Sequence, residues 1–228
     1  MDQEKRKQGK AIADRLRAEY ETQGTPLLWF DALYQEAEGD PDLIPWGHKQ
    51  ARFPLLNWLE RQPKQSCKGR ALDVGTGLGD NAAVLAKAGF NVTAFDISQT
   101  AVEWAKKRFA DLPIDWQAAD LLNPPQEWTG AFDLVSETFT IQALKEPERT
   151  QAFHALASLV APKGRLLIVA RGRLEEEPLN PPPWPLTPSE LDRFETLGFR
   201  SVLRETFFDQ KNPPMRHFLA QFQRDETS

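Results

Sequence analysis

The sequence predicts an α/β fold: a doubly wound, mostly parallel sheet of about seven strands that ends in an antiparallel hairpin. Short apolar runs alternate with amphipathic segments from residue 69 onward, which is typical of strands and of the helices that cover them. A glycine-rich turn follows the first apolar run, where a strand of a parallel sheet would enter its helix. Two apolar runs near the C-terminus, separated by a short polar stretch, predict the hairpin.

The length and composition favour one globular domain with a full core. The chain has 228 residues, of which 40% are hydrophobic and 27% are charged, and single α/β domains often reach this size. We expect one domain over residues 1–228, and we divide it into three segments. These are a helical and aromatic N-terminal segment (1–63), a central core (68–170), and a C-terminal loop, helix and hairpin (171–228).

The charge and the metal-binding residue types exclude several function classes. The 28 basic and 33 acidic side chains give a net charge of −5, which provides no general attraction to nucleic acid or to an anionic membrane. The lone Cys67 allows no intramolecular disulfide, and the three histidines lie too far apart for zinc-type spacing, so no metal site is expected. A charged N-terminus and the lack of a long apolar run predict a cytoplasmic location.

The N-terminal segment predicts helices around an aromatic cluster. Residues 4–23 have apolar side chains at four-residue spacing from Ile12 to Tyr20, which indicates a mostly exposed amphipathic helix. Residues 26–47 combine the aromatic cluster with turn signals, and residues 48–61 return to helical spacing. The cluster contains Leu27, Leu28, Trp29, Phe30, Leu33 and Tyr34.

The central core predicts five strands with helices between them. Ser98 is expected to cap the second of these helices, and Gly89 is expected to end the first. The strands are expected at 70–74, 91–96, 114–119, 131–136 and 164–170. The helices are expected at 80–88, 98–110 and 147–160.

The C-terminal segment differs in composition from the core. It begins with an acidic run, 175–177, and a proline-rich run, 181–185. Thr187 and the proline that follows it predict the capped start of a helix over 188–197. The last two strands are expected at 199–208 and 215–223.

The glycine-rich turn carries the clearest indication of a ligand. Asp73 ends a strand, and Gly75, Gly77 and Gly79 follow at every second position, so a ligand can approach the main chain closely. A dinucleotide-binding loop would place its third glycine where this chain has Asp80. Because a carboxylate there would repel a diphosphate, the two acids favour a cationic ligand without phosphate.

The turn and the strand ends together resemble the class I S-adenosylmethionine-dependent methyltransferases. Asp73 and the three glycines match the first motif of that family, and Asp96 matches the acid that ends its second strand. Asp120 is the candidate for the acid near the adenine, and Phe132-Asp133 matches the start of the fourth strand. The resemblance covers roughly residues 68–170 and implies a Rossmann-like fold, with S-adenosyl-L-methionine as cofactor and S-adenosyl-L-homocysteine as product.

The resemblance implies roles for individual residues in cofactor binding. Asp73 is expected near the amino end of the methionine part, and Asp96 is expected to accept hydrogen bonds from the ribose hydroxyls. Asp120 is expected to accept from the adenine amino group. The alternatives are a tight turn without ligand, a helix-capping Asp96 and a surface Asp120. The expected cofactor-binding residues are Asp73, Gly75, Thr76, Gly77, Gly79, Asp96, Ile97, Ala119, Asp120, Leu121 and Thr138.

Candidate catalytic and acceptor-binding residues come from the fourth strand and from the two flanking segments. Glu137, after the fourth strand, is expected to act either as a base or as a hydrogen-bonded acid with no catalytic role. The aromatic residues are either a lid over the cofactor or plain core. Arg171 and Arg173 are available for an acceptor carboxylate, but pairing with the glutamates at 175–177 is favoured. The acceptor-binding candidates are Trp29, Tyr34, Trp46, Phe139, Arg171 and Trp184.

The function that follows from the resemblance is methyl transfer to a small-molecule acceptor. The lack of an obvious histidine base favours a thiol or another soft nucleophile, which needs no strong base. The alternatives are a nicotinamide-dependent oxidoreductase and a non-catalytic protein that binds S-adenosylmethionine.

Overall fold

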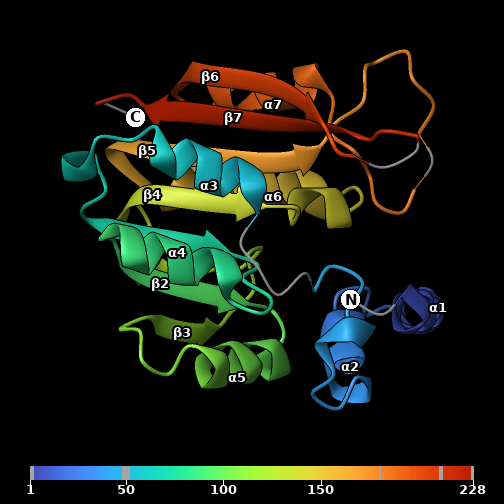
Figure 1. Ribbon diagram of the computed structural model, residues 1–228. Helices are drawn as coiled ribbons and strands as arrows, with labels where there is room; N and C mark the ends of the chain where they lie inside the picture. The colour runs from blue at the N-terminus through green and yellow to red at the C-terminus, as the bar shows by residue number, and fades with distance from the viewer. Residues whose placement is uncertain (1–2, 48–51, 180, 211–212, 227–228) are drawn as a thin grey trace. The chain divides into compact units, whose positions relative to one another are not determined.

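The computed structural model describes residues 3–47, 52–179, 181–210 and 213–226, which divide into two compact units (Figure 1). Unit 1 comprises Met1–Lys64 and Gly75–Asp120, and unit 2 comprises Gln65–Val74 and Leu121–Ser228. The chain passes from unit 2 into unit 1 directly after the first strand. The prediction of a single domain therefore stays a prediction.

Unit 1 combines an N-terminal group of helices with two parallel strands. Strand β2 pairs with β3 in parallel, with Thr93 opposite Asp115 and Asp96 opposite Ala118. Ser98 caps α5 by accepting from the Ala101 N–H, and Gly89 ends α4 in the left-handed region, as predicted. Its elements are α1 (Gln3–Thr22), α2 (Trp29–Glu36), α3 (Phe53–Glu60), α4 (Asp80–Ala88), β2 (Asn91–Asp96), α5 (Gln99–Arg108) and β3 (Asp115–Ala118).

The aromatic cluster of unit 1 forms a packed core around helix α2, a helix that the aromatic pattern alone did not predict. Trp29, Leu33 and Tyr34 are buried together with Ala13 and Leu16 of α1. Helix α1 is mostly exposed, as predicted, and packs on α2 through Ala13 and Leu16. The helix expected from residue 48 begins at Phe53, and residues 48–51 lie outside the described residues.

Unit 2 carries a mixed sheet with two helices. Strand β1 pairs in parallel with β4, and β4 pairs in parallel with β5. Strand β7 runs antiparallel to both β5 and β6, which confirms the predicted hairpin. Its elements are β1 (Arg70–Val74), β4 (Phe132–Thr138), α6 (Glu148–Leu159), β5 (Val160–Arg171), α7 (Pro188–Thr196), β6 (Phe199–Phe208) and β7 (Arg216–Arg224).

The seven-stranded sheet has the order β3-β2-β1-β4-β5-β7-β6, which confirms the predicted fold class. Strand β5 begins at Val160, before its expected start, because α6 ends at Leu159 and the chain extends at once. Phe194 of α7 packs on Phe153 of α6 and on Phe222 of β7, with ring centroids 5.0 and 5.1 Å apart. These rings bury one face of the unit 2 sheet.

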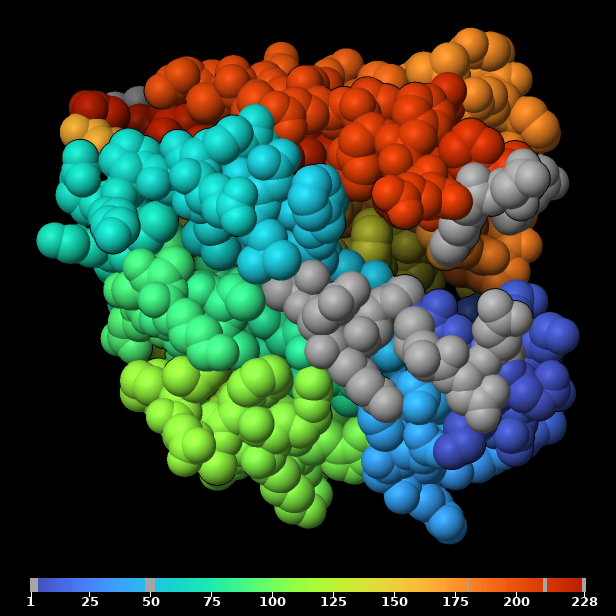
Figure 2. Space-filling view, in the orientation of Figure 1, coloured from blue at the N-terminus to red at the C-terminus, as the bar shows by residue number. Residues whose placement is uncertain are grey.

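The loop over 172–187 leaves β5 and returns to it. Leu186 donates its N–H to the Arg171 carbonyl, and Arg173 donates its N–H to the Leu186 carbonyl, at 2.9 Å each. Figure 2 shows this part of unit 2 (orange) at the molecular surface. Within the described residues, no helix combines the length and the apolar character that a membrane crossing requires.

Candidate functional site

The glycine turn of unit 1 needs its glycines for conformational and steric reasons. Gly77 has φ +53°, and a Cβ there would lie 3.2 Å from the Tyr34 hydroxyl oxygen and 3.9 Å from the Trp46 ring. Gly79 has φ +83°, and a Cβ there would lie 2.7 Å from the Trp116 ring and 2.9 Å from the Ala105 Cβ. Only glycine tolerates a positive φ together with such close neighbours. The turn is therefore both tight and closely covered.

Asp96 holds this turn from the end of β2. One carboxylate oxygen accepts the Gly77 N–H at 2.8 Å, and the other accepts the Ser98 N–H at 2.9 Å. Burial raises the pKa of Asp96, and these two N–H groups oppose that rise. Each carboxylate oxygen has a second lone pair, so the side chain retains acceptor capacity for hydroxyl groups.

Asp80 was expected to repel a diphosphate with its negative charge, but in the structure it is paired with an arginine. Arg108 of α5 donates to both oxygens of the Asp80 carboxylate, at 2.9 and 3.0 Å. This bidentate pair neutralises the charge that was expected to repel a diphosphate. The missing third glycine and the negative charge of Asp73 still disfavour a dinucleotide, but the expectation of a free negative charge at Asp80 is wrong.

Two of the aromatic candidates in unit 1 lie against the turn, and one lies in the core. The Trp46 indole N–H donates to the Tyr34 hydroxyl at 2.9 Å, and both side chains adjoin Gly77. Burial and the nearby Asp96 raise the pKa of Tyr34, which keeps it a phenol. Trp29 is only 3% exposed and packs among α1 and α2 side chains. A lid function stays a prediction for all three.

The other cofactor candidates of unit 1 gather around the same strand end. Thr76 donates its N–H to the Phe95 carbonyl at 2.8 Å, and Ala119 donates its N–H to the Asp96 carbonyl at 3.0 Å. Asp120 follows Ala119 and is half-buried. Ile97 lies between Asp96 and the Ser98 cap. Their roles toward a ligand stay predictions, as does that of Leu121, which is buried in unit 2.

In unit 2, the end of β4 concentrates buried polar atoms. Glu137 is fully buried, and its Oε1 accepts the N–H groups of Thr140 and Ile141. Its Oε2, the Ser136 hydroxyl and the Thr138 hydroxyl are buried without a hydrogen-bond partner among the described residues. Burial raises the pKa of Glu137 to about 7, and the two N–H groups oppose that rise. The two contacts of Oε1 agree with the expectation of a hydrogen-bonded acid without a catalytic role. Oε2 is free of such contacts among the described residues and remains available to accept a proton.

Asp73 lies at the corresponding end of β1. It is 1% exposed and stands opposite Ser136 in the β1–β4 register, one residue before Val74 stands opposite Glu137. The negative charge of Asp73 contributes to the raised pKa of Glu137. The strand pairing thus brings together two acids that are far apart in the sequence.

Phe139 follows β4 in a strained conformation. Its φ of +67° is rare for a bulky residue, and such outliers often mark functional positions. Its N–H donates to the Val169 carbonyl at 2.9 Å, and its ring centroid lies 5.7 Å from that of His217. Sequence reasoning missed His217, because only the β5–β7 pairing brings β7 to this strand end.

The two candidate arginines after β5 behave differently. Arg173 donates to the carbonyls of Leu174, Glu175 and Glu177. The pKa of Glu175 is lowered mainly by the Ser189 N–H and that of Glu177 mainly by Arg216, and the charge of Arg173 contributes less to both. Arg171 forms no ion pair with these glutamates, so the favoured interpretation is wrong for Arg171.

Glu177 instead pairs with Arg216 of β7. Glu177 is therefore paired with Arg216, and the Arg171 guanidinium has no carboxylate partner among the described residues.

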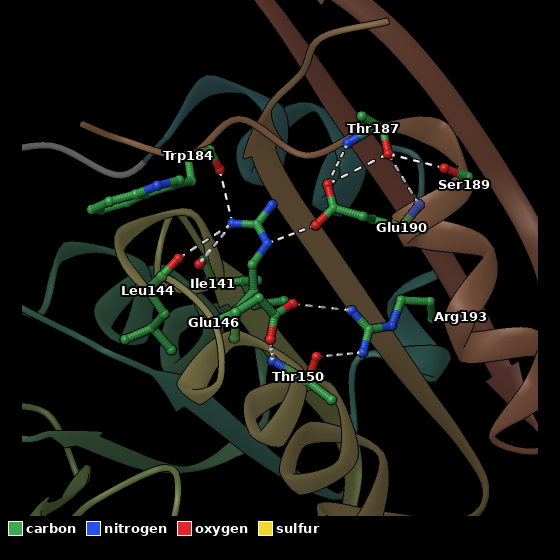
Figure 3. Close-up of polar contacts among 10 residues, drawn as sticks. Ile141, Leu144, Glu146, Thr150, Trp184, Thr187, Ser189, Glu190 and Arg193 are labelled. Carbon is green, nitrogen blue, oxygen red and sulfur yellow. Dashed lines mark hydrogen bonds and ion pairs between the residues drawn. The ribbon is translucent and has the colours of Figure 1, made fainter. Parts of the chain in front are cut away.

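Trp184 is held in place by a polar network that no sequence pattern indicated (Figure 3). Arg149 of α6 is 5% exposed; it pairs with Glu190 at 2.6 Å and donates to the Trp184 carbonyl at 2.9 Å. The Trp184 N–H donates to the Gln142 carbonyl at 2.8 Å. Glu190 also completes the predicted capping box with Thr187. Arg149 therefore ties the 172–187 loop to α6 and α7.

Part of the chain is similar to a known protein family. Residues 71–164 match the model of the methyltransferase domain family, which agrees with the glycine turn and the strand order.

Individual methyltransferases are similar to this chain over part of their length. An uncharacterized methyltransferase of Mycobacterium tuberculosis is 40% identical over 98 residues, which cover 43% of this chain and 48% of the relative. The ubiquinone biosynthesis O-methyltransferase of Aromatoleum aromaticum is 30% identical over 113 residues, covering 49% and 47%. The chain thus spans about half the length of the curated relatives it matches.

Solved structures share the fold over most of the chain. The 1,6-didemethyltoxoflavin-N1-methyltransferase of Burkholderia thailandensis, with bound S-adenosylhomocysteine, superposes with a TM-score of 0.65 at 16% identity. The superposition covers 86% of this chain and 85% of the Burkholderia chain. At this identity the likeness shows the methyltransferase fold alone.

Proposed function

We propose that this protein transfers a methyl group from S-adenosyl-L-methionine to a small-molecule acceptor, and that the accepting atom is a sulfur or another soft nucleophile. S-adenosyl-L-homocysteine would be the other product. The observation that carries the proposal is the glycine turn of unit 1 held by Asp96, with acceptor capacity left on both carboxylate oxygens.

The residues of the turn fit the proposed cofactor. Gly77 lies against the Tyr34 phenol and the Trp46 ring. Asp96 offers a carboxylate for two ribose hydroxyls, and such charged hydrogen bonds are stronger than neutral ones. Arg108, the cation that contacts the turn, is committed to the Asp80 carboxylate and to the Leu78 carbonyl. A cationic nucleoside without phosphate suits this donor and acceptor set.

The acceptor chemistry is inferred from unit 2. The cofactor would supply an electrophilic methyl on sulfur, so the chain needs mainly to orient the acceptor and exclude water. Glu137, with its pKa raised to about 7, is the candidate to hold a proton released by the acceptor. A carboxyl of this pKa is well matched to a thiol, whose ordinary pKa is about 8.5, and poorly matched to an alcohol.

Cofactor binding is tested by calorimetry with S-adenosylhomocysteine. Asp96→Asn is expected to weaken binding about 10- to 100-fold, because hydrogen bonds to a charged group contribute about 1.5–3 kcal/mol. Asp115→Asn is the matched control, since it changes an exposed aspartate of β3 whose carboxylate accepts from Thr93 and Gln117. Unchanged affinity of Asp96→Asn, or no binding by the wild-type protein, would contradict the proposal.

The acceptor class is tested with labelled S-adenosylmethionine and parallel panels of thiols, phenols, amines and carboxylic acids. Label transfer to thiols is expected to exceed transfer to the other classes. Transfer only to amines or carboxylates would contradict the soft-nucleophile proposal. Binding without any transfer would favour a non-catalytic role, and binding of a nicotinamide nucleotide in place of S-adenosylhomocysteine would favour an oxidoreductase.

A further inference from the structure

Arg171 is a half-buried cation of unit 2 that the fold leaves unpaired. It ends β5, and its guanidinium makes no hydrogen bond or ion pair among the described residues. Two other arginines of unit 2, Arg70 and Arg200, are exposed. The remaining arginines of unit 2 donate to a carboxylate, a hydroxyl or a carbonyl; these are Arg149, Arg165, Arg173, Arg193, Arg204, Arg216 and Arg224.

The backbone of Arg171 is nevertheless fixed. The side-chain oxygen of the buried Gln142 accepts the Arg171 N–H at 2.6 Å, and the Arg171 carbonyl accepts the Leu186 N–H at 2.9 Å. A guanidinium on a fixed backbone that loses water without gaining a partner is unfavourable in the free protein. It becomes favourable when a ligand supplies the acceptor.

Aromatic rings flank the position of Arg171. His217 stands directly opposite Arg171 in the β5–β7 register, so the two side chains share one face of the sheet. The His217 ring lies between Phe207, stacked at 5.2 Å, and Phe139, at 5.7 Å. A planar ligand suits such surroundings, since aromatic rings pair with other rings and with guanidinium planes.

We propose that Arg171 binds the carboxylate of a planar, aromatic acceptor, which names a substrate class for the site and rests on the proposed methyltransferase function. The planar guanidinium forms two parallel N–H···O bonds to a carboxylate, which fixes the orientation as well as the affinity of the acceptor. The accepting atom would then lie at the opposite end of the acceptor from the carboxylate.

Asp209 is the acid that this proposal must take into account. Burial lowers the pKa of Arg171, and the negative charge of Asp209 opposes that fall. A guanidinium nevertheless stays charged in proteins. Asp209 does not approach Arg171 as an ion pair; it accepts the Met215 N–H at 2.8 Å and lies 3.6 Å from His217 Nε2. It is therefore expected to weaken, but not prevent, binding of an anion at Arg171.

The test compares two probes that differ only in charge, 4-mercaptobenzoate and 4-mercaptobenzamide. Their dissociation constants are measured by calorimetry with S-adenosylhomocysteine present. The carboxylate is expected to bind the wild-type protein at least about tenfold more tightly than the amide. Arg171→Gln is expected to remove this difference, and Asp209→Asn is expected to increase it several-fold.

Two further variants separate anion binding from a merely structural role. Arg173→Gln, two residues along the same loop, is expected to leave the ratio of the two dissociation constants unchanged. Arg171→Lys keeps the charge without the planar fork, and is expected to give a ratio between those of the wild type and Arg171→Gln. If Arg171→Gln does not fold, the ratio of the two dissociation constants is measured on Arg171→Lys instead.

Equal affinities of the wild-type protein for the two probes, or failure of both to bind, would overturn the proposal. A ratio that survives in Arg171→Gln, or that falls equally in Arg173→Gln, would overturn it as well. Because binding is measured without turnover, these outcomes are distinct from failure of the proposed function, which appears as missing affinity for S-adenosylhomocysteine or missing label transfer. If S-adenosylhomocysteine does not bind, the same ratio measured without it still decides the role of Arg171.

Discussion

The glycine turn of unit 1 and the strand ends of unit 2 differ in how completely their polar groups are satisfied. In the turn, the two Asp96 oxygens and the N–H groups of Thr76 and Gly77 all have partners. At the end of β4, Glu137 Oε2 and two hydroxyls are buried without partners among the described residues. Native interiors rarely leave such groups unpaired. The turn is thus complete in the free protein, whereas the strand ends of unit 2 are incomplete.

The difference fits two kinds of ligand. A preformed turn suits an invariant cofactor that is bound in every reaction cycle, because no groups have to be rearranged for it. Unpaired groups and the strained Phe139 suit a ligand that supplies the missing contacts. Measurements of stability on variants of each unit test this difference.

The largest effect is expected for Arg149→Met, which removes the cation that ties the loop of Trp184 to α6 and α7. Loss of one partner of a buried ion pair leaves Glu190 without its cation, so the free energy of unfolding should fall by about 3–5 kcal/mol. Arg193→Met is the control in the same network, because Arg193 is 31% exposed and lies 3.8 Å from Glu146. Its effect should stay below about 1 kcal/mol.

Urea unfolding of both variants checks this expectation. Similar losses for Arg149→Met and Arg193→Met would mean that the network does not hold the loop. The position of the 172–187 loop would then depend on its backbone hydrogen bonds to β5 alone.

The next effect is expected in the turn of unit 1, for Gly79→Ala. The positive φ costs about 1–2 kcal/mol, and the overlap of the new Cβ with Trp116 and Ala105 adds about 1–3 kcal/mol. Gly24→Ala is the matched control, since Gly24 also has a positive φ (+73°) but no atom within 4 Å of its Cβ position. Unfolding experiments should therefore show a larger loss for Gly79→Ala. Equal losses would indicate that the turn can relax and is not preformed.

The turn of unit 1 was predictable because its contacts are local. The three glycines, Asp96 and the Ser98 cap lie within a short stretch of sequence, and each residue type has a direct conformational reason for its position. The one error there, the charge of Asp80, arose because its partner Arg108 comes from the far end of α5.

The strand ends of unit 2 were less predictable because their neighbours are distant in sequence. His217 reaches Phe139 only through the β5–β7 register, and Arg149 reaches Trp184 only through the fold of the 172–187 loop. Neither pairing leaves a periodicity or a motif in the sequence. The helix α2 was missed for a related reason, since its aromatic residues are set by packing in the core of unit 1.

The smallest effect, and the most direct test of the incomplete strand end, is expected for Glu137→Gln. The pKa of Glu137 is about 7 in the folded protein, against 4.5 as its ordinary value. Between these two values the folded protein holds a proton that the unfolded chain has lost, so the stabilising contribution of Glu137 is lost as the pH rises through about 7. Glutamine keeps the acceptor for Thr140 and Ile141 without titrating. From pH 4 to pH 8, the free energy of unfolding of Glu137→Gln should therefore rise relative to the wild type by about 1–3 kcal/mol. A difference that does not change with pH would mean that Oε2 is satisfied in solution, and the contrast between the two units would then disappear.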